Sequence, residues 1–171
     1  MEYRITLANV DRNVDLAHTL IAARHPSETM EHVTLRVLAW CLLYDERLEF
    51  GAGLSDPDAA DLWAHDLTGR LVTWIECGGA SGDKLRKVVQ HHAGAAVHCV
   101  FSSARRREEL LAEIADWKRA GEIKRWTVDP AMVATLAERD QRRQQWTVTV
   151  VGDHFYVEAD SLTVEGAVER G

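Results

Sequence analysis

The chain has 171 residues, 46% of them hydrophobic, which suffices for one well-buried core but not for two comfortable domains. We therefore expect a single domain over residues 1–171. The formal net charge of −7 argues against a protein that coats nucleic acid non-specifically, because that needs a basic surface, although a local basic cleft is compatible with it. The sequence shows neither a signal-peptide pattern nor an apolar run of membrane-spanning length, so we expect a cytoplasmic protein without membrane attachment.

Three widely spaced cysteines stand in apolar surroundings: Cys41, Cys77 and Cys99. Their odd number and their spacing give no zinc motif and are typical of reduced thiols in a protein core.

The N-terminal segment predicts a β-hairpin. Residues 3–10 alternate apolar and polar side chains as a strand does, and residues 11–13 form a polar turn. The alanines and leucines of residues 14–24 would also suit a helix. Their place between a turn and a helix start favours a second strand.

The next segment predicts a helix that begins at His25-Pro26-Ser27-Glu28 and runs to about Tyr44. Proline in the first turn loses no hydrogen bond, and an acid there complements the helix dipole. Glu28, His32 and Arg36 recur at a spacing of four, with Glu31 beside them. A solvated helix face is the favoured interpretation of that polar stripe. A short extended piece and a loop from Gly51 to Asp58 follow.

The stretch from residue 58 to residue 87 predicts a second hairpin that brings two acids together. If Thr68 and Gly69 form its tip, cross-strand partners have numbers that sum to 137, and Asp61 lies opposite Glu76 on the same face. A slip of one residue would put the two acids on opposite faces.

A positive partner is expected between those acids, because two like charges directly opposite each other are destabilising. The partner would be a divalent cation or a basic side chain, and Lys84 and Lys87 of the following helix are in reach. Glu76 also ends the apolar run 71–75, which is typical of a buried strand. A carboxylate there is costly without a partner, which indicates a functional residue.

The glycine-rich residues 77–82 lack the signature of a phosphate-binding loop and are interpreted as a connection. Asp83 is predicted to cap a helix over residues 84–92, and residues 95–101 are predicted to form a strand parallel to that of Glu76. The remaining elements are predicted as a helix over 103–120 ended by Gly121, a strand over 123–128, a helix from Asp129 to Arg139, a hairpin of 146–151 with 154–159, and an edge strand with a frayed tail from Leu162.

Four segments in this order closely resemble the YaeQ family: ARHPSETMEHVTLRVLAW, YDERLEF, DLWAHDLTG and WIECG. The resemblance covers nearly the whole chain. It implies a mixed α/β fold of the PD-(D/E)XK restriction-endonuclease-like type, with a mixed sheet flanked by helices and an extra β-hairpin. The family has no established physiological role.

The resemblance also implies roles for individual residues. Asp61 and Glu76 would be the two strand acids, and the helical glutamate would be Glu28 or Glu31. The lysine that the nuclease pattern has two residues after the second acid is replaced here by Gly78. Lys87 is the first choice to replace it, and Lys84 the second.

Two functions follow from this resemblance. The first is a phosphodiesterase or nuclease acting on DNA or RNA, in which the acids hold Mg²⁺, or Mn²⁺ as a substitute, and the metal activates water while the lysine positions it. The second is an inactive binding module for a protein or nucleic acid, in which salt bridges close the pocket and Arg24, Ser27 and Arg36 matter as much as the acids. A third, purely structural alternative is a buried ion pair of Glu76 with Lys87. An enzyme needs a free acid cluster, whereas a binding module pairs its acids with basic residues.

Overall fold

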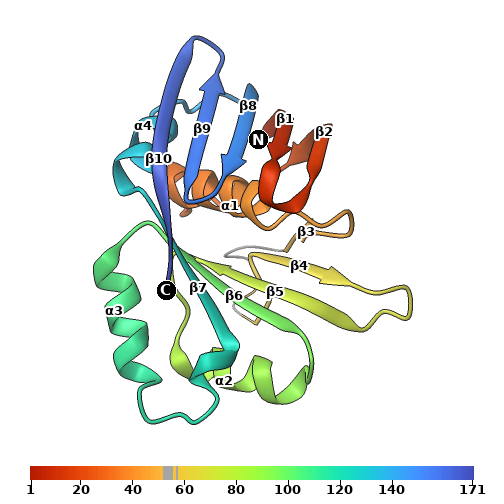
Figure 1. The fold of residues 1–171 in the computed structure, drawn as a ribbon, viewed down its shortest axis with the longest axis vertical. Helices are drawn as coiled ribbons and strands as arrows, with labels where there is room; N and C mark the ends of the chain where they lie inside the picture. The colour runs from red at the N-terminus through yellow and green to blue at the C-terminus, as the bar shows by residue number, and fades with distance from the viewer. Residues whose placement is uncertain (52–55, 57) are drawn as a thin grey trace.

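The structure is a computed structural model that describes residues 1–51, 56 and 58–171. Its strands form one ten-stranded sheet in the order β2-β1-β8-β9-β10-β7-β6-β5-β4-β3 (Figure 1). The strands are β1 (Glu2–Asn9), β2 (Val14–Ile21), β3 (Glu49–Phe50), β4 (Leu62–His65), β5 (Leu71–Cys77), β6 (Ala96–Phe101), β7 (Ile123–Val128), β8 (Arg143–Val151), β9 (His154–Ala159) and β10 (Leu162–Arg170). The helices are α1 (Met30–Leu42), α2 (Gly82–His91), α3 (Ala104–Glu113) and α4 (Pro130–Ala137), with 3-10 turns η1 (Val10–Arg12) and η3 (Ala120–Glu122).

The sheet is mixed, as the sequence predicts. Strand β1 runs parallel to β8, and β5, β6 and β7 run parallel to one another, while the other neighbouring pairs are antiparallel. Figure 1 shows β2, β1, β8 and β9 in its upper part, β4 to β7 in its lower part, and the long β10 joining the two.

Helix α1 is the centre of the larger hydrophobic core. Its side chains pack with buried residues of both parts of the sheet, and it contacts β1, β5, β6, β8 and α4. Helices α2 and α3 cover the opposite face of the lower strands and enclose a second core there. The N-terminal half of α1 lies next to the end of β5, since His32 contacts the Cys77 carbonyl (3.1 Å).

The predicted start of α1 is wrong. Residues 25–28 form a turn in which the Glu28 amide donates to the His25 carbonyl (2.8 Å). The helix begins after Thr29, whose hydroxyl accepts a hydrogen bond from the His32 amide, because a threonine in extended conformation caps a helix well. The predicted solvated face is wrong for Glu28 and Arg36, which are buried, whereas Glu31 is exposed.

The predicted register of the second hairpin is confirmed. Leu62 pairs with Ile75 and Trp63 with Trp74, and both pairs sum to 137. The register shifts by one residue after Ala64, towards the turn. Strand β6 lies parallel to β5 as predicted. The loop predicted from Gly51 to Asp58 lies for the most part outside the described residues.

The first hairpin (β1 and β2) and the third (β8 and β9) are also confirmed. Three other predictions are corrected. Ser81, not Asp83, caps α2, since its hydroxyl accepts from the Lys84 amide. Helix α3 ends at Glu113, well before Gly121, as the chain turns to place Trp117 against the second core. Strand β10 is internal rather than an edge, because its last residues pair with β7.

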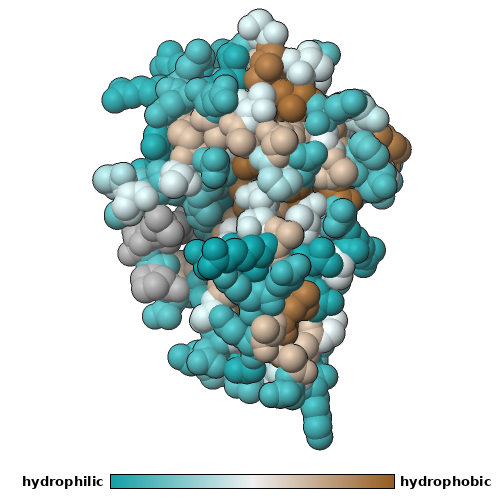
Figure 2. All heavy atoms as spheres, turned by 90° about the vertical axis from the view of Figure 1, so that its left-hand side faces the viewer, coloured by the Kyte–Doolittle hydropathy of each residue, from teal (hydrophilic) through white to brown (hydrophobic). Residues whose placement is uncertain are grey.

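The three cysteines are free thiols and buried, as predicted. In the described part of the chain no helix has the length and apolar character needed to cross a bilayer. Figure 2 shows the side on which α3 and α4 lie, where hydrophilic side chains cover most of the surface and hydrophobic ones show only in small groups.

Candidate functional site

Glu76 lies near the end of β5 with only 4% of its surface exposed. Its Oε1 accepts hydrogen bonds from the Lys84 ammonium group (2.7 Å) and from the indole of Trp74 (2.7 Å). Lys84 also donates to the Ala59 carbonyl (2.8 Å). Burial raises the pKa of Glu76, although the hydrogen bonds and charge of Lys84 oppose that change. Of the two lysines predicted from the sequence, the second choice, Lys84, therefore contacts the acid.

Asp61 immediately precedes β4 and is also buried. Its Oδ2 accepts the backbone N–H of Cys77 (2.7 Å), and its Oδ1 lies 3.5 Å from Nε2 of His32 and 3.6 Å from Nε of Arg36. The hairpin brings Asp61 and Glu76 together as predicted, but each carboxylate is bound to its own partners.

Glu28 is buried and lies just before α1 rather than on it. Its Oε1 contacts Nδ1 of His32 (2.6 Å) and the Arg36 guanidinium (3.1 Å), and its Oε2 accepts the backbone N–H of His25 (3.1 Å). Burial raises the pKa of Glu28, but the hydrogen bonds from His32 and His25 and the charge of Arg36 outweigh it, so the pKa is lowered overall. Glu31, the alternative helical acid, is exposed and outside this group.

His32 links the acids. Nδ1 faces Glu28, while Nε2 faces the Cys77 carbonyl (3.1 Å) and Asp61. Both ring nitrogens thus face acceptor oxygens, which only the protonated imidazolium satisfies with two donors. Burial alone would lower the pKa of His32, but the hydrogen bonds to Asp61 and Glu28 and their charges raise it to about 9.

Arg36 is fully buried on α1 and completes the group. Besides Glu28, it donates to the carbonyls of Ala23 (3.1 Å), Gly51 (3.3 Å) and Asp61 (3.4 Å). These contacts tie α1 to the segment before it and to the chain that leads into β4.

We call this group the charge cluster. It contains three acids and three basic residues: Glu28, Asp61, Glu76, His32, Arg36 and Lys84. With His32 protonated the formal charges cancel. Arg24 and Ser27 make no ion pair with its members. The Arg24 guanidinium pairs with Asp140 (3.0 Å) and donates to the Glu28 backbone carbonyl (3.0 Å), and Ser27 contacts the ring of His25 (2.7 Å).

The charge cluster does not fit a divalent cation as it stands. Carboxylate oxygens that would have to bind Mg²⁺ already accept hydrogen bonds from protein groups, and basic side chains lie among them. Within the described residues no group of three or more His, Cys, Asp and Glu side chains is arranged to hold a metal. The magnesium site implied by the resemblance stays a prediction.

The backbone explains why no lysine stands at position 78. Gly78 has φ +76, a left-handed conformation that side chains with a Cβ disfavour, and a Cβ there would lie 3.4 Å from the His32 ring. A lysine at this position would be strained. Lys84, on the first turn of α2, reaches Glu76 instead.

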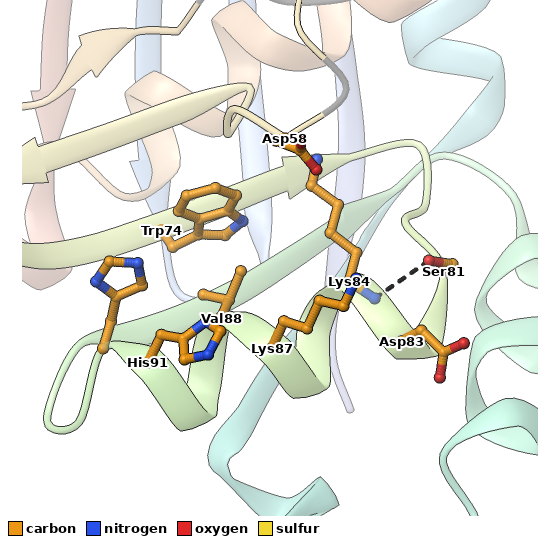
Figure 3. A pocket seen from close by; sticks show the side chains of 9 residues that line it. Asp58, Trp74, Ser81, Asp83, Lys84, Lys87, Val88 and His91 are labelled. Carbon is orange, nitrogen blue, oxygen red and sulfur yellow. Dashed lines mark hydrogen bonds between the residues drawn. The ribbon is translucent and has the colours of Figure 1, made fainter.

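A pocket of about 390 Å³, which we call the α2 pocket, includes in its lining Lys84 and Trp74, the two hydrogen-bond partners of Glu76. It is lined by Asp58, Trp74, Ser81, Asp83, Lys84, Lys87, Val88, His91 and His92. Figure 3 shows the α2 side chains facing Trp74 of β5, with the end of Lys84 reaching up to Asp58. Lys87, the first choice from the sequence, is exposed in this pocket and does not contact Glu76. Asp83 is paired with Arg86 (3.0 Å).

Fold and site together define a mixed α/β protein with a single large sheet and an internally neutralised cluster of buried charges. The model of the YaeQ protein family matches residues 1–168, and the chain belongs to that family. It is 30% identical over 151 residues to the uncharacterised YaeQ protein of Salmonella typhi, covering 85% of this chain and 80% of the relative. It is 37% identical over 100 residues to the uncharacterised YaeQ protein of Escherichia coli K12, and the match covers 58% of this chain and 55% of the relative.

Two crystal structures of YaeQ proteins have the same fold. That from Xanthomonas axonopodis pv. citri superposes with a TM-score of 0.88 at 27% identity, covering 99% of this chain and 95% of the other. That from Pseudomonas syringae superposes with a TM-score of 0.86 at 28% identity, covering 99% of this chain and 93% of the other. The family's function is uncharacterised.

Sequence reasoning did not identify His32 as a site residue. The only signal was its spacing of four residues from Glu28 and from Arg36. A solvated helix face shows the same spacing of polar residues, so the signal does not distinguish the two cases. The turn before α1 and the end of β5, which bury these side chains, come from distant parts of the chain.

Proposed function

We propose that this chain is a non-catalytic binding module whose α2 pocket holds a phosphate-bearing partner, a nucleic acid. The proposal rests mainly on one observation, the internal pairing of the strand acids. Glu76 accepts from Lys84 and Trp74, and Asp61 from the Cys77 amide. Acids so engaged have a structural task, and they leave no free carboxylate pair for metal-assisted hydrolysis.

The α2 pocket supports an anionic partner. Lys87 and His91 lie one helical turn apart and are exposed on the same side of α2, and His92 is exposed next to them. In the described part of the chain, Lys87 makes no ion pair. Two acids also line the pocket, Asp58 and Asp83, and Asp83 is paired with Arg86 (3.0 Å). A phosphate group would therefore meet cationic donors at this site, even though the chain as a whole is acidic.

Binding of a labelled single-stranded oligonucleotide at low salt tests the proposal. Lys87→Glu should weaken binding about tenfold or more, because it replaces a favourable phosphate contact with a repulsive one. Lys118→Glu is the matched control, since Lys118 is exposed on another part of the surface. Equal effects of the two substitutions, or binding of an acidic peptide in place of the oligonucleotide, would overturn the assignment.

A metal-dependent nuclease is the second candidate, favoured by the pairing geometry of β4 and β5 that sets Asp61 next to Glu76 and Lys84. It requires the charge cluster to open and exchange its basic partners for Mg²⁺. Mg²⁺-dependent cleavage of an end-labelled oligonucleotide by the wild type, abolished in Glu76→Gln, would favour this candidate over the binding module.

A further inference from the structure

Strand β2 forms one edge of the ten-stranded sheet, next to β1 (Figure 1). It is eight residues long, and all eight pair with β1 on one side. The opposite edge of the sheet, β3, has only two residues. Only β2 therefore offers a long strand edge within the described chain.

The hydrogen bonds at the start of the sheet define which backbone groups face outward. Met1 and Ala22 exchange two hydrogen bonds of 3.0 Å each. Because such pairs alternate along an antiparallel ladder, the even-numbered residues of β2 bond to β1. The N–H and C=O groups of the odd-numbered residues point to the free edge: Asp15, Ala17, Thr19 and Ile21. All four residues are exposed, and among the described residues none of their outward groups has a partner.

This edge lacks the features that usually prevent pairing. The sequence VDLAHTLI contains no proline, no glycine and no lysine, and Asp15 is its one acid. Ile21 is 64% exposed, which is high for an apolar side chain. An edge of this kind is a template for another strand.

We propose that the β2 edge binds the β2 edge of a second copy of this chain, so that the two sheets become continuous through an antiparallel pair. With a twofold axis at His18, Asp15 faces Ile21 of the second copy and Ala17 faces its Thr19. Every outward amide and carbonyl of the four odd-numbered residues is then paired in both copies. Asp15, the only acid of β2, does not lie opposite Asp15 of the second copy, so that no two carboxylates face each other.

The side chains on the core-facing side of β2 support the same register. Leu16 and Leu20 of the two copies come opposite each other, and the two His18 side chains meet at the axis. His18 already stacks on Trp40 (5.5 Å between centroids), which holds its ring over the core. An unrelated extended peptide would pair with the same backbone groups, but only a second copy gives this self-complementary arrangement.

Amide hydrogen exchange by NMR tests the proposal on the wild-type protein. As the protein concentration is raised from micromolar to millimolar, sedimentation should show a dimer forming. Over the same range, the amides of Asp15, Ala17, Thr19 and Ile21 should become protected from hydrogen exchange. The amides of Leu16, His18 and Leu20 should be protected at every concentration, because they bond to β1. A chain that stays monomeric, or a dimer in which the odd-numbered amides exchange as fast as in the monomer, would overturn the proposal.

A variant pair tests the same edge. Ala17→Pro removes an outward amide without touching the bonds to β1, and it should weaken the dimer about tenfold or more, since two symmetry-related hydrogen bonds are lost. Ala17→Ser keeps the amide and should dimerise as the wild type does. If Ala17→Pro folds and dimerises equally well, the β2 edge is not the interface; if it does not fold, the exchange pattern of the wild type decides alone.

Discussion

The ammonium nitrogen of Lys84 lies 2.7 Å from Oε1 of Glu76, and both side chains are largely buried between β5 and α2. Lys84 also donates to Ala59, and Glu76 also accepts from Trp74. A further hydrogen bond thus holds each of the two side chains in place. The pair fastens the hairpin to the first turn of α2, next to the α2 pocket.

Loss of Lys84 should destabilise the fold. Lys84→Met leaves the Glu76 carboxylate buried without its charged partner, and we expect about 2 kcal/mol less stability in urea unfolding, below the range for fully buried pairs because Lys84 is partly exposed. Lys87→Met is the control, with an expected change within about 0.5 kcal/mol. Adding Glu76→Gln to Lys84→Met should restore part of the loss. Equal stability of the two lysine variants would contradict a structural role for the pair.

The charge of His32 makes stability depend on pH. Its pKa is about 9 in the folded chain, against about 6.5 when unfolded. The stabilisation is therefore fully present below pH 6.5 and is lost as the pH rises through 9, by about 3 kcal/mol. Unfolding of the wild type and of His32→Gln from pH 6 to pH 10 measures this contribution.

The contribution of His32 is given by the difference in free energy of unfolding between the wild type and His32→Gln at each pH. Burial raises the pKa of the Cys41, Cys77 and Cys99 thiols, so the unfolded chain loses their protons first and both proteins become less stable above about pH 8.5. A difference that is constant over the whole pH range would show that His32 is not held as the imidazolium.

Gly78 should not tolerate a side chain. Gly78→Ala forces a Cβ into a left-handed conformation beside His32, and we expect a loss of about 1–2 kcal/mol in thermal or urea unfolding. Gly121→Ala is the matched control, because a Cβ there meets no atom within 4 Å and the backbone is not left-handed. If both substitutions have the same small effect, backbone strain does not explain the absence of a lysine at position 78.

Local signals predicted the hairpin of β4 and β5 correctly. The polar turn 66–70 between apolar runs specifies which residues lie opposite each other, and a register slip would move every side chain to the other face. The prediction that Asp61 and Glu76 lie near each other followed from that register.

The charge cluster was beyond such local signals. Glu28, His32 and Arg36 have the spacing of a solvated stripe, and their burial depends on contacts with Cys77 and Asp61, far along the chain. The central place of β10 was missed for the same reason, because pairing with β7 is decided by the packing of the whole sheet.

The claim that the charge cluster is internally neutralised is tested most directly by calorimetric titration of the wild type and of Glu76→Gln with Mg²⁺ and Mn²⁺, at neutral pH and moderate salt. Because Lys84, Trp74 and the Cys77 amide already engage the acids, we expect no binding to either protein. Binding by the wild type in the micromolar to low millimolar range that disappears in Glu76→Gln would contradict this account and favour the nuclease.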